Sequence, residues 1–146
     1  MKVLVTGFTP FGGEQINPSW EAVKRLPEHI GEMTITKREI PTEFDAAGAA
    51  LRAAMDELRP DAVLSVGQYG GANGIRVERV AVNLRDARIA DNAGAKPVDE
   101  PVVPGAPDAY FATLPTRRIV EKLRGEDIPA QLSYSAGSRS TPRGRR

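Results

Sequence analysis

The sequence contains no cysteine and only one histidine among its 146 residues. Without cysteine the chain can form no disulfide bond, no thiolate metal site and no cysteine nucleophile. The single histidine, His29, lies in the polar connection Pro27–Gly31 with no catalytic signature around it. We therefore do not expect His29 to act in catalysis.

Long apolar runs are also missing, since no stretch of about 18 apolar residues occurs that could span a bilayer. Met1 and Lys2 lead directly into Val3–Val5, which is too short for a signal peptide. We therefore expect a cytoplasmic protein without a membrane partner. No motif indicates a metal or a cofactor, and the length with its 40% apolar content suits one domain with a core.

The charge is unevenly distributed along the chain. The net charge is +1, but residues 138–146 contain four arginines and no acid, which leaves 16 basic against 19 acidic residues elsewhere. We expect one α/β domain over residues 1–137 and a basic, disordered tail over 138–146. A nucleic-acid arm is the alternative for this tail, but no aromatic residues are interleaved with the arginines, so we expect no nucleic-acid partner.

Apolar runs that read as buried strands alternate with amphipathic helical patterns. The order strand, helix, strand, helix, strand is typical of an α/β layer fold with right-handed crossovers. The expected strands cover residues 3–8, 33–40, 61–67, 75–83 and 128–134, and the expected helices cover about 17–26, 43–58 and 115–125.

The sequence also predicts the local structure of residues 75–89 and 91–107. The strand 75–83 and the short piece 87–89 resemble a hairpin joined across Leu84–Asp86. Residues 91–107 contain four prolines and cannot form a helix. A loop of this length is commonly functional or contacts another subunit.

The glycine-rich stretch Gly67–Gly74 follows an apolar strand pattern and predicts a site where the strand opens into a loop. If the next segment is extended, Glu78 shares a strand face with Val80 and Val82. A carboxylate in such a place is costly unless it has a partner. Two roles of Glu78 are therefore compatible with the spacing. It could form an ion pair with Arg79 or Arg88, or it could be a catalytic acid.

Phe8 and Phe11 lie on the turn-rich loop after the first expected strand. They could be plain core residues. They could equally form the apolar wall of a pocket, because α/β sheets bind ligands at the carboxyl ends of their strands.

Six segments follow one another in an order that is typical of one family: Thr6–Gly13, Asn17–Ser19, Glu78–Asn83, Asp86–Ile89, Asp91–Gly94 and Pro97–Pro101. They resemble the motifs of the pyroglutamyl peptidase I family, also called pyrrolidone carboxyl peptidases. The resemblance runs from Met1 to about Gly137. It implies an α/β/α sandwich with a mixed central sheet, a homotetramer, and a cysteine peptidase that removes N-terminal pyroglutamate (5-oxoproline) from peptides.

The resemblance implies roles for six residues. Glu78 matches the acidic member of a Cys-His-Glu triad, which would orient and stabilise the imidazolium. Arg88 matches an arginine near the oxyanion site. Gln68 matches a polar group near the site, and the residues that match the wall of the pyrrolidone pocket are Phe8, Phe11 and Ile89.

The sequence departs from the family pattern at two places. Ala72 stands where the family usually has an arginine, and after Gly137 the segment with the catalytic cysteine and histidine is replaced by an arginine-rich one. Thr141 falls at the cysteine's spacing but has no activating neighbour, so it receives no role. We expect an N-terminal fragment, as after a change of reading frame, that lacks the C-terminal elements and its own catalysis. A non-catalytic protein that binds pyroglutamyl peptides, or pairs with full-length subunits through its long loop, is the alternative.

Overall fold

The structure is a computed structural model that describes residues 1–134. The chain forms two compact units, one of residues 1–68 and 90–95 and the other of residues 69–89 and 96 onward. Each unit is described by itself. The predicted basic tail, 138–146, lies outside the described residues.

The first unit contains a mixed four-stranded sheet in the order β2-β3-β1-β4. The strands β1 (Lys2–Phe8), β3 (Met33–Ile40) and β4 (Ala62–Ser65) are parallel, whereas the short edge strand β2 (His29–Ile30) is antiparallel to β3. The predicted mixed sheet is therefore confirmed, with β2 added from a stretch that the sequence presented as a polar connection.

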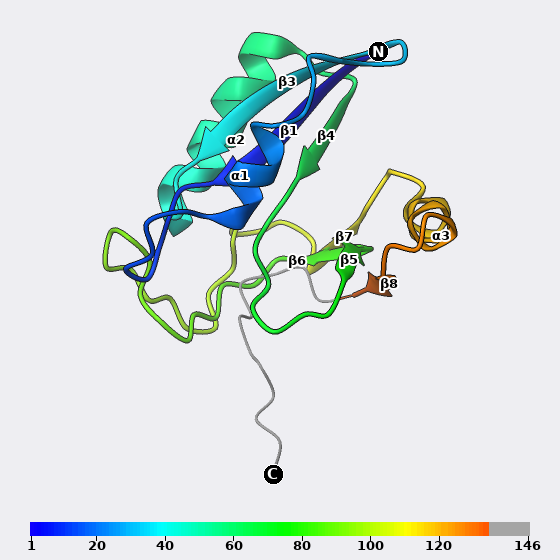
Figure 1. Cartoon of the computed structure of the whole chain (residues 1–146). Coiled ribbons are helices and arrows are strands. Elements are labelled where there is room, and N and C mark those ends of the chain that lie inside the picture. The colour runs from blue at the N-terminus through cyan, green and yellow to red at the C-terminus, as the bar shows by residue number, and fades with distance from the viewer. Residues whose placement is uncertain (135–146) are drawn as a thin grey trace. The chain divides into compact units, whose positions relative to one another are not determined.

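Two helices cover this sheet, α1 (Pro18–Val23) and α2 (Phe44–Leu58). The connection from β1 through α1 to β3 runs one way across the sheet, and the connection from β3 through α2 to β4 runs back past β1. Right-handed crossovers in opposite directions place their helices on opposite faces, as Figure 1 shows. This unit therefore has the three layers of the predicted α/β/α sandwich.

The first helix begins as its sequence predicts and ends earlier. Asn17 Oδ1 accepts a hydrogen bond from the Ser19 amide at 3.0 Å, and Pro18 occupies the first helical position. The helix ends at Val23 and not near Leu26, because Pro27 disfavours helical angles at the residue before it. The Lys37 ammonium group donates a hydrogen bond to the Leu26 carbonyl at 2.7 Å.

One buried apolar cluster of the first unit lies between the sheet and α1. Leu4 and Val23 are almost fully buried, and Val5, Val23 and Ile35 form one cluster. Gly7 allows the close approach of α1 to β1, because a Cβ atom at Gly7 would lie 2.6 Å from the Cα atom of Trp20. A glycine is therefore required at this position by packing.

As far as residue 134, the second unit contains two small sheets and one helix. The parallel pair consists of β5 (Ile75–Glu78) and β8 (Ala130–Ser133), and α3 (Thr116–Gly125) packs against this pair. The antiparallel pair consists of β6 (Val80–Val82) and β7 (Ala109–Phe111).

The prediction of one continuous strand over residues 75–83 is wrong, because the segment is interrupted at Arg79, between β5 and β6. The amide of Arg79 donates to the Ser133 carbonyl at 2.7 Å, whereas its carbonyl accepts from the Ala112 amide at 2.9 Å. Arg79 thus joins two different ladders. An alternating sequence pattern shows that a segment is extended, but it does not show that the partner strand changes midway.

The predicted hairpin with residues 87–89 is also wrong, because β6 pairs with β7 and residues 87–89 form no strand. The long loop binds this segment instead. Arg85 and Glu100 exchange two backbone hydrogen bonds at 2.6 and 3.1 Å, and the Ala87 amide donates to Pro97 at 2.8 Å. As predicted, the proline-rich loop contains no helix. Among residues 1–134, no helix is long and apolar enough to cross a membrane.

Candidate active site

Phe8 is the last residue of β1 and lies at the carboxyl edge of the sheet. Its amide donates to the Ser19 hydroxyl at 3.0 Å, which fixes the end of β1 to the start of α1. A Cβ atom placed on Gly67 would lie 4.0 Å from Cε2 of Phe8. The structure therefore brings the half-buried Phe8 ring beside the loop that carries Gln68, whose side chain is exposed.

The loop that carries Phe11 is tied down by polar contacts within the first unit. The Thr42 hydroxyl donates to the Thr9 carbonyl at 2.7 Å, and the Asn17 amide group donates to the same carbonyl at 3.0 Å. The Asn92 amide group donates to the Pro10 carbonyl at 2.8 Å. These bonds hold the half-buried Phe11 in a fixed backbone, as a pocket wall requires.

Asp91 fixes the neighbouring start of α2. Its Oδ2 accepts from the Phe44 amide at 2.7 Å, while Oδ1 accepts from the amides of Ala93 and Ala95 at 2.9 and 2.8 Å. The residue at the N-cap position, Glu43, makes no side-chain cap. The Phe44 hydrogen bond, followed by smaller contributions from the Asp91–Ala95 turn, lowers the pKa of Asp91 below its usual 3.8, against an opposing effect of burial.

Glu78 is the last residue of β5, half-buried, in register with the buried Ser133 of β8. Side chains of register partners in a parallel ladder project to the same face. Arg76 shares that face because it lies two residues before Glu78. Its Nη2 donates to the Ser133 hydroxyl at 2.9 Å, so its guanidinium group reaches along the strand pair to the level of Glu78.

Arg76 and Ser133 were not predicted as site residues. The Arg76 guanidinium group also lies over the Tyr69 ring, 4.4 Å from its centre. Arg76 could have been predicted, because side chains two residues apart on a strand project to the same face, and Arg76 lies two residues before Glu78. Ser133 offered no signal, because its register with Glu78 joins residues 55 positions apart in the sequence.

Arg88 and Ile89 follow the buried Ala87, and both side chains are exposed. The backbone at Ala87 is held by Pro97, and the ion pair between Arg85 and Glu100, with an N–O distance of 3.0 Å, holds the preceding turn. Arg88 and Ile89 thus project from a segment with a fixed base.

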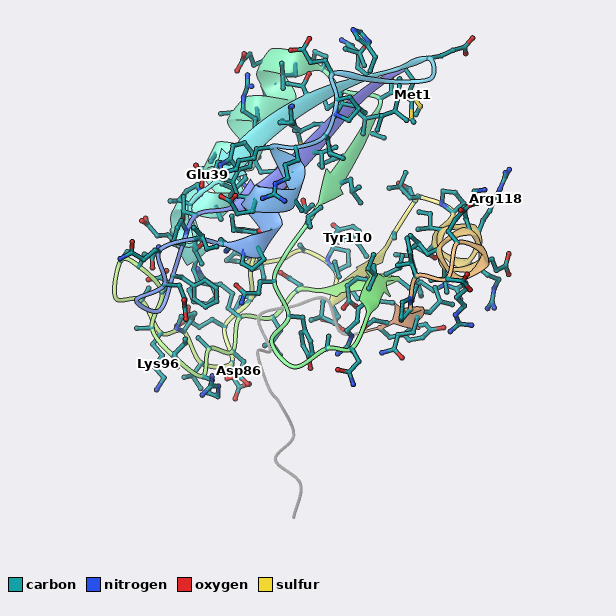
Figure 2. The ribbon with its side chains drawn as sticks, viewed as in Figure 1. Met1, Glu39, Asp86, Lys96, Tyr110 and Arg118 are labelled. Atoms are coloured by element: carbon teal, nitrogen blue, oxygen red, sulfur yellow. The ribbon has the colours of Figure 1, made fainter. Side chains whose placement is uncertain are left out.

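The six predicted site residues are divided between the two units. Phe8, Phe11 and Gln68 belong to the first unit, and Glu78, Arg88 and Ile89 belong to the second. Side chains of both units are drawn in Figure 2. The first group offers aromatic surface and an amide, and the second offers a carboxylate and a guanidinium group.

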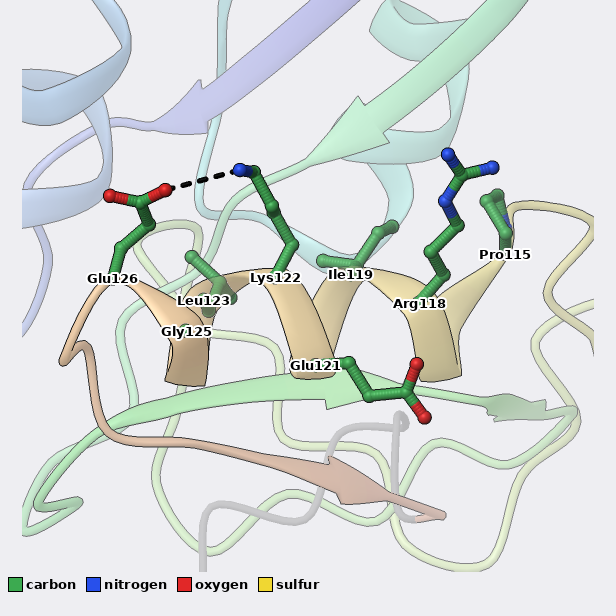
Figure 3. A pocket seen from close by; sticks show the side chains of 8 residues that line it. All are labelled: Pro115, Arg118, Ile119, Glu121, Lys122, Leu123, Gly125 and Glu126. Atoms are coloured by element: carbon green, nitrogen blue, oxygen red, sulfur yellow. Dashed lines mark hydrogen bonds and ion pairs between the residues drawn. The ribbon is translucent and has the colours of Figure 1, made fainter.

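Three other features of residues 1–134 are the single histidine, the possible metal ligands and a hollow on α3. His29 lies exposed on β2, opposite Thr34 of β3. Within residues 1–134 no group of three or more histidines and acidic residues could hold a metal ion. The lining of a hollow on α3, shown in Figure 3, includes Ile119 and Leu123 together with the ion pair of Lys122 and Glu126.

Comparisons with known proteins identify relatives of this chain. The family model described as pyroglutamyl peptidase matches residues 1–139. A pyrrolidone-carboxylate peptidase of Thermococcus onnurineus is 53% identical over 138 residues, which cover 94% of this chain and 69% of the relative. One of Gloeobacter violaceus is 54% identical, with 94% and 67% covered. The chain therefore spans about two thirds of the length of these relatives.

Solved structures agree in fold as well as in sequence. The crystal structure of pyroglutamyl peptidase I from Bacillus amyloliquefaciens matches with a TM-score of 0.90 at 52% identity, covering 94% of this chain and 67% of that one. A mutant pyrrolidone carboxyl peptidase from Pyrococcus furiosus matches with the same TM-score at 50% identity, covering 94% and 66%. The fold and the motifs define a peptidase scaffold of the α/β class. The chain belongs to the pyroglutamyl peptidase family.

Proposed function

We propose that this chain carries the substrate pocket and the acidic residue of a thiol peptidase that removes N-terminal pyroglutamate from peptides, and that the 146-residue chain does not itself catalyse the reaction. The observation that carries the proposal is the family match over residues 1–139 together with the placement of Phe8 and Glu78 at strand ends. Site residues at the carboxyl ends of strands are the usual arrangement in α/β folds.

The ligand-binding part of the proposal rests on Phe8, Phe11 and Ile89. A pyrrolidone ring is small and flat, with two apolar faces and one amide edge. Aromatic and aliphatic side chains on fixed backbone can enclose such faces, while the Gln68 amide can bond the ring's amide edge. The fixed loop at Thr9 and Pro10 supports this role.

The chemical part of the proposal rests on Glu78 and Arg88. A carboxylate beside an imidazole orients the ring and stabilises its charged form, and a guanidinium group can stabilise a tetrahedral oxyanion. Both tasks require a nucleophile with its base. The sequence has no cysteine, and its one histidine is the exposed His29 on β2. The peptidase pathway thus lacks its covalent step.

The test is hydrolysis of a pyroglutamyl 7-amido-4-methylcoumarin substrate by the 146-residue chain, purified from a host that lacks its own pyroglutamyl peptidase. We expect no release of fluorophore above a heat-treated sample, because removing the nucleophile abolishes the route and does not merely slow it. A turnover rate near that of an intact relative, measured in parallel, would contradict the proposed loss of catalysis.

Subunit pairing is a second role that one observation favours. Within residues 98–111, five large apolar side chains are 48–74% exposed: Val98, Val102, Val103, Tyr110 and Phe111. Figure 2 labels Tyr110, which lies on β7. Exposed apolar side chains gathered in one segment are typical of association surfaces. We infer that the chain self-associates through residues 98–111. The cytoplasmic location stays a prediction from the sequence.

A further inference from the structure

The second unit contains a hollow of about 430 Å³ between the loop 69–74 and the first residues of β5 and β8. Its polar lining includes two guanidinium groups and two amide groups, and no acidic residue lines it within the described part of the chain. The residues with polar side chains in this lining are Tyr69, Asn73, Arg76, Arg124 and Gln131. Such a lining has an excess of positive charge and of hydrogen-bond donors.

The floor of this hollow is fixed by backbone contacts. The Ile75 amide donates to the Pro129 carbonyl at 2.8 Å, at the point where the parallel pairing of β5 and β8 begins. A Cβ atom at Gly74 would lie only 2.5 Å from the same carbonyl oxygen, so the loop is pressed against the chain before β8. The hollow therefore has a defined shape on this side.

Arg124, in the last turn of α3, is oriented toward this floor. Its Nε donates to the Ala130 carbonyl at 2.7 Å, which is the one hydrogen bond that residues 1–134 give to this guanidinium group. A guanidinium group held through Nε keeps the edge formed by its two terminal nitrogens, and such an edge can bind both oxygens of a carboxylate. Less side-chain entropy is then lost on binding.

Arg76 supplies a second positive charge in a fixed position. Its guanidinium group lies 4.4 Å from the centre of the Tyr69 ring, and its Nη2 donates to the Ser133 hydroxyl at 2.9 Å. The charge thus stays at the wall of the hollow. Ile75, Pro129 and Ala130 add apolar surface to the same lining.

We propose that this hollow binds a small organic carboxylate whose carboxyl group pairs with Arg124, in the field of Arg76, and whose apolar body lies on Ile75 and Pro129. A planar carboxylate matches the fork of a single arginine, and the apolar part of the lining favours an organic anion over an inorganic one. This inference does not depend on the peptidase function, because neither Glu78 nor Arg88 lines the hollow.

The experiment is a titration of the ¹⁵N-labelled 146-residue chain with isovalerate, followed through amide shifts of Gly71, Gly74 and Gln131. Isovaleramide, which has the same shape without the charge, and inorganic phosphate are titrated in parallel at equal ionic strength. We expect isovalerate to shift these amides and to bind at least tenfold more tightly than either comparator, since charge-assisted hydrogen bonds are the strong ones. Equal binding of isovalerate and isovaleramide, or tighter binding of phosphate, would overturn the carboxylate assignment.

Two variants locate the binding. Arg124→Gln should weaken isovalerate binding about tenfold, whereas Arg118→Gln, on the same helix but outside this hollow, should leave it unchanged. Amide spectra of both variants establish that they are folded. Unchanged affinity in folded Arg124→Gln would overturn the proposal, and so would an equal loss in both variants. The comparison of isovalerate with isovaleramide on the unmodified chain tests the proposal without any variant.

Discussion

Replacing Gly7 by alanine should destabilise the first unit although it adds only one methyl group. The backbone angles at Gly7 are open to any residue, so contact alone decides the outcome. The new Cβ would lie 2.6 Å from the Cα and 2.7 Å from the amide nitrogen of Trp20, and these are backbone atoms of α1. Because backbone atoms cannot rotate away, α1 must move outward from β1.

The size of the effect follows from two losses. Overpacking of one methyl group against a rigid neighbour costs about 1–3 kcal/mol. Movement of α1 also stretches the 3.0 Å hydrogen bond from the Phe8 amide to the Ser19 hydroxyl, which is worth about 1 kcal/mol. We therefore expect a loss of about 2–4 kcal/mol in unfolding free energy, measured by urea denaturation, and faster hydrogen exchange at the Phe8 amide.

Gly48→Ala is the matched control within the same unit. Gly48 lies inside α2, and its nearest heavy atom to a new Cβ would be the flexible Nη1 of Arg52 at 3.6 Å. Alanine is favoured over glycine inside a helix by about 0.5–1 kcal/mol, so this variant should be more stable than the original chain. If Gly7→Ala matched Gly48→Ala in stability, the close packing of α1 on β1 would be refuted.

Two further predictions concern Asp91 and Phe111. The pKa of Asp91 is lower in the folded chain than its usual 3.8, so the ionised carboxylate stabilises the fold above pH 3.8, and this stabilisation is lost as the pH falls through the folded-state pKa. Asp91→Asn should therefore make the unfolding free energy, measured by urea denaturation between pH 6 and pH 3, depend less on pH. An unchanged pH dependence in the variant would refute the role of Asp91. Phe111 is 74% exposed, so Phe111→Ser should lower the oligomer fraction in sedimentation velocity at equal protein concentration, and an unchanged oligomer fraction would count against association through residues 98–111.

The first unit could be predicted from the sequence because its signals are local. Asn17 and Pro18 mark the start of α1, and the apolar stripe from Phe44 to Leu58 marks α2, which the structure contains with the predicted end. Parallel strands joined by helices then leave few topologies. The edge strand at His29 was missed because two residues carry no periodicity.

The second unit could be predicted less well because its pairings are distant in sequence. β6 pairs with β7, about 30 residues further on, and Arg85 pairs with Glu100 in the proline-rich loop. No local pattern specifies such partners. The same holds for Glu78, whose register partner Ser133 became visible only in the fold, whereas the positions of Glu78 and Arg88 themselves were named through family motifs.

We propose that this chain retains the pyroglutamyl pocket without the reaction. The most direct measurement is a titration of the ¹⁵N-labelled chain with pyroglutamyl-alanine amide, with prolyl-alanine amide as the control, in which proton spectra of the same samples also report free 5-oxoproline. We predict saturable shifts at the amides of Phe8, Phe11, Gln68 and Ile89 with the pyroglutamyl peptide only, and no 5-oxoproline. Equal responses to both peptides, no response to either, or accumulating 5-oxoproline would contradict the claim.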